Sequence, residues 1–158
     1  MKRHPTRTLF VMLGLAALCP SATADRFGNS VVMTEVASGN YYVSGLISNA
    51  VKADFLVDTG SGYVTLTTDL FASVIGLPGT EYSREIRGAM ANGKIQRVKL
   101  YRVKTLTLTE DCVLSDIEVA VIPGSRKNIL GLSALRHVAP FALELNPPRL
   151  HLSNCVTV

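Results

Sequence analysis

The stretch Phe55-Leu56-Val57-Asp58-Thr59-Gly60-Ser61 places an acidic residue directly after three consecutive apolar ones. An unbroken apolar run is typical of a strand that is covered on both faces, so we expect residues 55–57 to be buried. Burying a carboxylate is costly unless hydrogen bonds or a paired charge compensate for the lost water. Gly60 allows backbone amides to approach Asp58 closely, and the hydroxyls of Thr59 and Ser61 can donate to carboxylates or carbonyls. The stretch therefore predicts a tight loop around a functional carboxylate.

The same motif also has a simpler interpretation as an ordinary Asx-type turn. From average composition, a bare Asp-Thr-Gly is expected in roughly one chain in 30 of this length, so it needs support from elsewhere. Asn128-Ile129-Leu130-Gly131 is such a segment, because glycine follows two apolar residues directly before a predicted helix at 132–136. Taken alone, this segment is best explained as a strand that turns into a helix through its glycine. The two segments support a functional site only when they are considered together.

Most of the chain after residue 31 consists of short runs rich in β-branched and aromatic residues, separated by Gly, Asn and Pro. This pattern is typical of an all-β barrel or sandwich. The predicted strands are 31–36, 41–47, 51–57, 117–121, 141–145 and 150–152. A short helix is predicted over 69–75, with Thr68 as its N-cap and Gly76 after its end. Asn92-Gly93 lies between strand-like stretches and predicts a hairpin with a two-residue turn.

Together these segments resemble the retropepsin-like aspartic peptidases, specifically their exported bacterial members. The resemblance rests on residues 55–61, on the hairpin around Asn92-Gly93 and on residues 128–131 with the helix that follows, and it extends from about residue 31 to 152. It implies a mostly β fold: a closed β-barrel-like acid-protease lobe with one or two short helices. It also implies a flap over a cleft, formed by Met90, Ala91, Asn92 and Gly93, and packing of Ile129, Leu130 and Gly131 beside the Asp-Thr-Gly loop.

The resemblance further implies roles for the residues of the loop. Asp58 would be the catalytic carboxylate, Thr59 would brace the loop against its counterpart in a second subunit, and Gly60 would hold the carboxylates through its backbone amide. Ser61 matches a small-residue position of the family. Gly62 departs from the small or hydroxylated side chain that usually follows, which removes one hydrogen bond to Asp58. The flap also lacks a tyrosine at its tip.

The chemistry of these enzymes requires two carboxylates. One takes a proton from water while the other, which is protonated, donates to the scissile carbonyl, and the close pair shares one proton. A chain of 158 residues with one Asp-Thr-Gly fits a single lobe and supplies one carboxylate. We therefore expect a homodimeric aspartic endopeptidase that brings Asp58 to a two-fold axis twice and cleaves a protein or peptide substrate. The alternative is a non-catalytic periplasmic binding or scaffolding module that keeps the fold.

The first 24 residues have the layout of a secretory signal peptide. Lys2, Arg3 and Arg7 precede the apolar run Leu9 to Leu18, and Ala22-Thr23-Ala24 forms a cleavage site. The run is shorter than the roughly 20 residues that a spanning helix needs, although retention as an uncleaved anchor is an alternative. We expect a signal peptide at 1–24, a peptidase domain at 25–158, a periplasmic or secreted location, and no stable membrane insertion after signal removal.

Composition and motifs argue against several other classes of protein. Without the signal, the chain has 13 basic and 12 acidic residues, so electrostatics give no reason to expect nucleic-acid binding. We expect no metal and no cofactor, because there is no His-Glu-x-x-His and Gly60-Ser61-Gly62 lacks the third glycine of a dinucleotide loop. Ser61 is not in the Gly-x-Ser-x-Gly elbow of a serine hydrolase. Seven basic residues between Arg84 and Lys104 indicate a solvated hairpin, with a preference for acidic substrates as the alternative.

Two cysteines, Cys112 and Cys155, follow the predicted signal. An even number of cysteines in an exported chain favours a disulfide between them. The alternative is a pair of buried free thiols that behave as small apolar side chains. Neither interpretation gives them a catalytic role.

Overall fold

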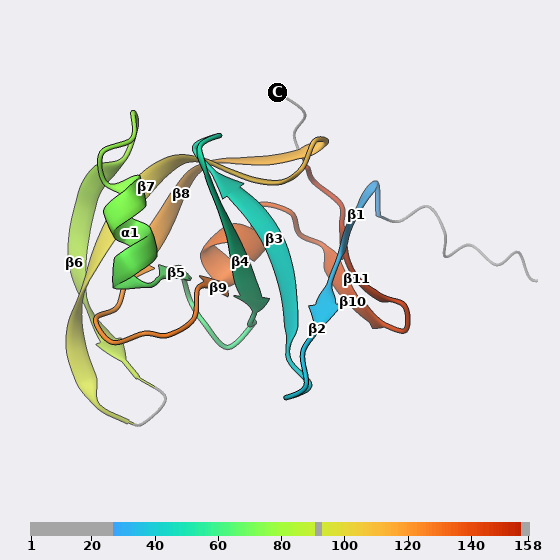
Figure 1. The fold of residues 1–158 in the computed structure, drawn as a ribbon, viewed down its shortest axis with the longest axis horizontal. Coiled ribbons are helices and arrows are strands. Elements are labelled where there is room, and N and C mark those ends of the chain that lie inside the picture. Colours follow the sequence, from blue (N-terminus) through green and yellow to red (C-terminus); the bar gives the residue numbers. More distant parts are fainter. Residues whose placement is uncertain (1–26, 91–92, 156–158) are drawn as a thin grey trace, which may run out of the picture.

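The computed structural model describes residues 27–90 and 93–155 (Figure 1). The described residues form strands joined by short connections, together with two short helices. In chain order the elements are β1 (Asn29–Val32), β2 (Thr34–Glu35), β3 (Tyr41–Ile47), β4 (Val51–Val57), β5 (Val64–Leu66), α1 (Thr68–Val74), β6 (Glu81–Ala89), β7 (Ile95–Thr109), β8 (Cys112–Val121), β9 (Ile129–Leu130), α2 (Leu132–Leu135), β10 (Phe141–Leu145) and β11 (Pro148–Leu152). The predicted mostly β lobe with one or two short helices is confirmed. The predicted signal peptide lies outside the described residues.

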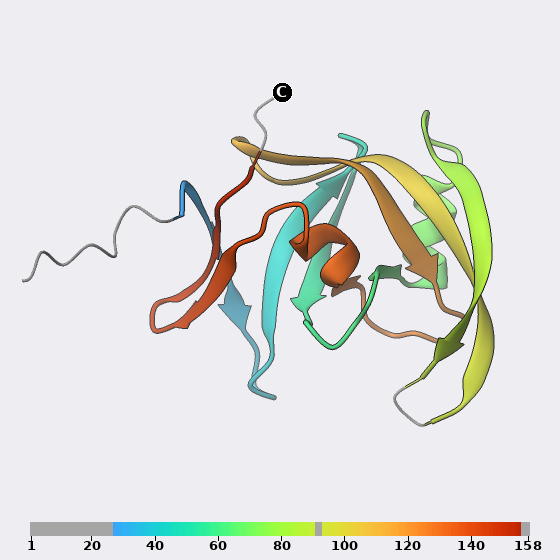
Figure 2. The ribbon, with the colours of Figure 1, turned by 180° about the vertical axis from the view of Figure 1, so that it is seen from behind.

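The strands are arranged in two sheets. The larger sheet has the order β2-β3-β4-β9-β5-β8-β7-β6, and β3 also pairs with β7. These pairings form a closed ring of six strands, in the order β3, β4, β9, β5, β8 and β7. The smaller sheet has the order β1-β11-β10 and combines strands from both ends of the described chain. Both ribbon views place it on the opposite side of the molecule from the β6–β7 hairpin (Figures 1 and 2).

The N-terminal strands show where local sequence decides the structure and where it does not. β3 and β4 have the predicted bounds, and the turn between them holds Ser48 and Asn49 at positive φ values of 47° and 55°. The prediction of one strand over 31–36 is wrong. The chain leaves the small sheet after β1 and joins the larger sheet at β2, because β1 pairs with β11 whereas β2 pairs with β3.

Helix α1 begins one residue earlier than predicted. Thr67, not Thr68, is its N-cap: Thr67 has an extended backbone, and its hydroxyl accepts the Leu70 N–H at 3.2 Å. The Thr67 N–H in turn donates to the side chain of Asn128 at 3.0 Å. This long-range bond satisfies the Thr67 N–H, and no pattern within the helix itself indicates it.

The hairpin predicted around Asn92-Gly93 is present, with β6 and β7 antiparallel and Ala89 opposite Ile95. The two-residue turn is wrong, because Met90 N–H donates to the Lys94 carbonyl and Gly93 N–H donates to the Met90 carbonyl, both at 2.8 Å. Gly93 has a φ of 77°, a conformation that favours glycine. The other two predicted flap residues, Ala91 and Asn92, lie outside the described residues.

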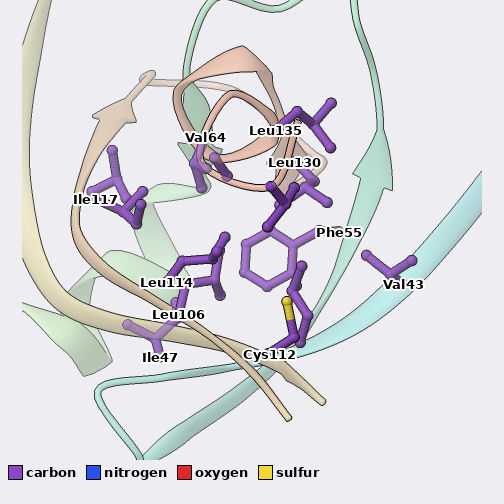
Figure 3. Close-up of a cluster of buried hydrophobic side chains, with 14 of the residues drawn as sticks. Val43, Ile47, Phe55, Val64, Leu106, Cys112, Leu114, Ile117, Leu130 and Leu135 are labelled. Atoms are coloured by element: carbon purple, nitrogen blue, oxygen red, sulfur yellow. The ribbon is translucent and has the colours of Figure 1, made fainter. Parts of the chain in front are cut away.

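The core lies inside the ring of strands and anchors the end of β4. Phe55 is fully buried at its centre, and Figure 3 shows its ring among Leu114, Leu106 and Leu130. Phe55 and Leu130 come from the two segments that the sequence singled out. Their burial fixes the strand from which Asp58 follows, and large-to-small changes at such sites typically cost about 2–5 kcal/mol.

The C-terminal segment is tied to the barrel by a disulfide. Cys112, at the start of β8, is bonded to Cys155 across a sequence separation of 43 residues, which confirms the predicted pairing. Cys112 belongs to the buried core, so the bridge connects the segment after β11 to the centre of the lobe. In the part of the chain that the structure describes, no helix has the length and apolar character needed to cross a membrane.

Candidate active site

Asp58 leaves the end of β4 and enters a tight loop. Its backbone N–H donates to the Leu130 carbonyl at 3.2 Å, and one of its carboxylate oxygens, Oδ1, accepts the Gly60 N–H at 2.9 Å. The Asp58 carbonyl accepts the Ser61 N–H at 3.3 Å. The loop therefore curls around the carboxylate, and Gly60 supplies the backbone amide that the sequence predicted.

The burial of this stretch differs from the prediction. Phe55 is buried, but Leu56, Val57 and Asp58 are only half-buried, so the strand is not covered on both faces. Phe55 faces the core, whereas the strand end lies beside a cleft that this single chain leaves open. Thr59 is exposed.

The second predicted segment packs directly against this loop. β9 runs parallel to β4, with Leu56 opposite Ile129 and Val57 opposite Leu130. A Cβ atom on Gly131 would lie 2.2 Å from the Tyr63 carbonyl oxygen and 2.7 Å from that of Ser61.

Backbone atoms cannot retreat as a side chain can, so position 131 has room only for glycine. The Leu132 N–H also donates to the Ser61 carbonyl at 2.8 Å. Residues that are far apart in the sequence thus build one compact loop structure.

A cleft of about 750 Å³ opens above the loop. Its lining comes from the Asp58 loop, from the inner face of the β6–β7 hairpin and from the end of β8. The residues include Asp58, Gly60, Ser61, Gly62, Tyr63, Ile86, Gly88, Met90, Gln96, Val98, Ala120 and Ile122. Most of these side chains are apolar, and Asp58 is the single carboxylate among the lining residues that the structure describes. The predicted flap hairpin therefore lies over the predicted carboxylate.

The Ser61 hydroxyl binds backbone rather than the carboxylate. Ser61 Oγ donates to the Tyr63 carbonyl at 2.9 Å. A Cβ at Gly62 would meet nothing within 4 Å, so the departure from the family pattern leaves open space there. Within the described residues, the hydrogen bond from Gly60 is the contact that holds the Asp58 side chain.

Sequence reasoning missed several polar groups that support the site. Ser133 Oγ accepts the Val64 N–H at 2.8 Å and donates to the Glu118 carbonyl at 2.9 Å, so it joins β5 and β8 to α2. Its position in the first turn of α2 was a usable signal, because a hydroxyl at the start of a helix often binds nearby backbone. Asn128 also reaches two segments, since its side chain donates to the Asp54 carbonyl and accepts from Thr67.

An ion pair between β6 and β8 was also missed. Arg84 donates to both carboxylate oxygens of Glu118, from Nη2 at 2.7 Å and from Nε at 3.1 Å. These bonds, and one from the Ser83 hydroxyl, lower the pKa of Glu118. The same pairing raises the pKa of Arg84. Two residues separated by 34 positions give no local sequence signal of such contact.

Metal-dependent chemistry has no evident site in residues 27–90 and 93–155, where no group of three or more His, Cys, Asp or Glu side chains is placed to hold an ion. His151 lies on β11, where its Nε2 is 2.8 Å from a carboxylate oxygen of Glu144. It does not line the cleft. Asp58, by contrast, lies at the cleft.

Comparison with known proteins agrees with this geometry. The sequence model of the aspartyl protease family matches residues 43–134, which are more than half of the chain. Among solved structures, a retropepsin-like aspartic protease from Rickettsia conorii superposes with a TM-score of 0.60 at 21% sequence identity, covering 78% of this chain and 91% of that one. No curated protein sequence matches the chain. The chain therefore belongs to the aspartyl protease family and has the fold of a retropepsin-like aspartic peptidase.

Proposed function

We propose that this protein is an aspartic endopeptidase that acts as a homodimer, with Asp58 of each protomer contributing one carboxylate to a shared site. The observation that carries the proposal is the position of Asp58, held by the Gly60 amide at the edge of a 750 Å³ cleft. Hydrolysis by this route needs a base and an acid at the same scissile bond. Because the described lining holds one carboxylate, a second copy supplies the other.

The cleft also supports a peptide substrate. Its apolar lining, with Ile86, Val98 and Ala120 on the hairpin side, suits substrate side chains, while the β6–β7 hairpin covers the bound chain. Closing a hairpin over a substrate excludes water other than the attacking molecule. In the proposed dimer, the exposed Thr59 of each protomer would brace the opposite loop.

The small sheet provides a surface for dimerisation. β10 is an edge strand of this sheet, and its Leu143 and Leu145 are 46% and 55% exposed. An edge strand carrying exposed leucines is unfavourable in an isolated subunit, because it offers both free backbone groups and apolar surface to another chain. Pairing with the same edge of a second copy would give the free backbone groups hydrogen-bond partners and cover the apolar surface.

An exported location follows from the apolar N-terminal segment and is supported by the disulfide. Bonded cysteines persist mainly in oxidising compartments such as the periplasm. Expression of the full chain in a bacterium with a periplasm should yield a mature protein beginning at Asp25 in the periplasmic fraction. Recovery of the whole chain from the cytoplasm, with both thiols free, would contradict this location.

The decisive test of activity compares the wild type with Asp58→Asn on a peptide library and then on one cleaved peptide. Asparagine keeps the shape of aspartate but cannot exchange the proton, so turnover should fall by about 100- to 10,000-fold. Circular dichroism and the mass of the dimer should not change.

Asp54→Asn is the matched control, because Asp54 lies on the same strand, binds Ser44 and is not part of the cleft lining. It should retain turnover. Undiminished cleavage by Asp58→Asn would reject the proposed mechanism. A stable monomer that binds peptides without cleaving them would instead identify a binding module.

A further inference from the structure

One wall of the cleft is a face shared by β6, β7 and β8. Val98, Leu100 and Ala120 form a buried apolar cluster on this face, and Tyr63 and Ile86 pack against it. All of these except Leu100 also line the cleft. Tyr63 comes five residues after Asp58, so its ring joins the loop of the carboxylate to the hairpin wall.

The polar end of this wall is a fixed guanidinium group. Arg84 on β6 makes two parallel hydrogen bonds to Glu118 on β8, at 2.7 and 3.1 Å, and Ser83 Oγ donates to the same carboxylate at 2.7 Å. Two-point pairing sets the orientation of the planar guanidinium as well as its position. Arg84 therefore cannot rotate freely although its side chain is 53% exposed.

The same guanidinium reaches Tyr63. Arg84 Nη2 donates to the Tyr63 hydroxyl at 3.3 Å, so the phenol is held at its tip while its ring packs on the apolar cluster. Held at both ends, the ring presents one surface to the cleft. The contact joins the hairpin, the β8 strand and the segment that follows the Asp58 loop.

We propose that Arg84, oriented by Glu118, is a positioning residue that fixes the Tyr63 ring as a wall of the substrate cleft, where the ring contacts an apolar side chain of the bound peptide. This inference rests on the proposed peptidase function and names residues that set its substrate affinity. Tyr63 acts in binding rather than in proton transfer, because its hydroxyl is directed to Arg84 rather than to Asp58. Losing Arg84 frees the ring and weakens binding of the substrate.

The simpler alternative is that the Arg84–Glu118 pair only stabilises the hairpin. Exposed ion pairs contribute little to folding stability, so stability alone separates the two explanations poorly. Kinetics separate them well. A positioning role through Tyr63 predicts a change in KM with an unchanged kcat, and it predicts that the change disappears when the Tyr63 hydroxyl is absent.

The experiment uses the mature dimer, one peptide that the wild type cleaves, and Arg84→Gln, Tyr63→Phe and the double variant. Each single change should raise KM by about 3- to 10-fold, as expected for one lost hydrogen bond. The double variant should be no worse than Arg84→Gln, with kcat within about twofold of wild type in all three.

Arg97→Gln is the matched control. Arg97 lies on the partner strand β7, pairs with Glu85 at 3.2 Å and is 82% exposed, and it has the same charge as Arg84. Its loss should leave KM unchanged.

A second readout does not depend on activity. With ¹³C-labelled tyrosine, the Tyr63 ring signals are assigned by their loss in Tyr63→Phe. Arg84→Gln should shift these signals, whereas Arg97→Gln should leave them in place.

The outcomes distinguish this inference from the proposed function. Three results would overturn the inference and leave the proposed peptidase function intact. The first is a wild-type KM in Arg84→Gln, and the second is an equal effect of Arg84→Gln on KM with and without the Tyr63 hydroxyl. The third is that the Tyr63 ring signals do not shift in Arg84→Gln. Absence of cleavage by every protein, wild type included, would overturn the proposed function and this inference with it.

Discussion

At the scale of single residues, Gly131 shows how closely the site is packed. A Cβ at this position would lie 2.2 Å from the Tyr63 carbonyl oxygen and 2.7 Å from that of Ser61. The same segment donates the Leu132 N–H to the Ser61 carbonyl. The position of Asp58 thus depends on the absence of a side chain 73 residues later in the sequence.

Gly131→Ala should therefore destabilise the protein and reduce peptide cleavage. Relief of the overlap must move the loop that carries Asp58, and forced packing of this kind typically costs about 1–3 kcal/mol or more. Urea unfolding and turnover of one peptide measure both effects. Gly62→Ala is the matched control, because a Cβ there meets nothing within 4 Å, and it should unfold at the wild-type urea concentration. Equal stability of the two variants would contradict the argument.

Glu118 makes stability depend on pH. Its pKa is lowered chiefly by the hydrogen bond from Arg84, so this interaction contributes stability above the pKa of the unfolded carboxyl and loses it as pH falls through the lower folded value. The difference in unfolding free energy between wild type and Glu118→Gln should shrink as pH falls from 7 to about 3. Urea titrations across this range measure it.

Arg84→Gln provides the control for that pH dependence. In an Arg84→Gln background, most of the effect of Glu118→Gln should vanish, because the largest cause of the lowered pKa has been removed. A difference between wild type and Glu118→Gln that grows on acidification would contradict the assignment.

At the scale of elements, helix α1 depends on one hydroxyl. Thr67→Ala removes the acceptor of the Leu70 N–H and should cost about 1 kcal/mol of stability, a typical value for an N-cap. Thr68→Ala, one residue later and already inside the helix, should have little effect. Denaturant unfolding of the two variants gives the comparison. A larger loss of stability in Thr68→Ala would indicate that Thr68 is the N-cap, as the sequence predicted.

The elements also show what the sequence could and could not predict. The bounds of β3 and β4 were readable because runs of β-branched and aromatic residues and the Ser48-Asn49 turn are local signals. The break after β1 was not readable, since a change of sheet decides it, and the cap was placed at Thr68 because Thr67 and Thr68 are adjacent residues of the same type.

The candidate site likewise has parts that the sequence predicted and parts that it did not. The Asp58 loop and the glycine segment were recognisable as motifs, and the structure brings them together. Tyr63 and the Arg84–Glu118 pair were not, because each acts through a partner distant in the sequence, while Ser133 had only its place at the start of α2 as a signal. Motifs mark residues with strict local requirements, whereas supporting contacts emerge only from the fold.

At the scale of the whole molecule, the lobe has two open features. The cleft exposes one carboxylate, and the small sheet exposes the edge strand β10. The disulfide from Cys112 ties the end of the chain, just after β11, to the barrel core. The sheet that carries the exposed edge is thereby fixed relative to the barrel that carries Asp58. In the proposed dimer, pairing through that sheet would set the geometry of the shared site.

Leu145→Lys should therefore weaken the dimer and, with it, the activity. Leu145 is 55% exposed on β10, and a lysine there places two equivalent charges near the two-fold axis of a symmetric interface, where they repel. Sedimentation equilibrium should show more monomer, and specific activity should fall more steeply on dilution than in the wild type. At high protein concentration the activity should recover, because each protomer still carries an intact Asp58 loop.

Ile75→Lys separates this effect from a general effect of surface charge. Ile75 is 51% exposed at the end of α1, in the barrel rather than in the small sheet, so the same substitution there should leave both dimer and activity unchanged. Loss of the dimer in both variants would indicate nonspecific destabilisation. A wild-type dimer in Leu145→Lys, with specific activity constant on dilution, would show that the two carboxylates meet through another surface.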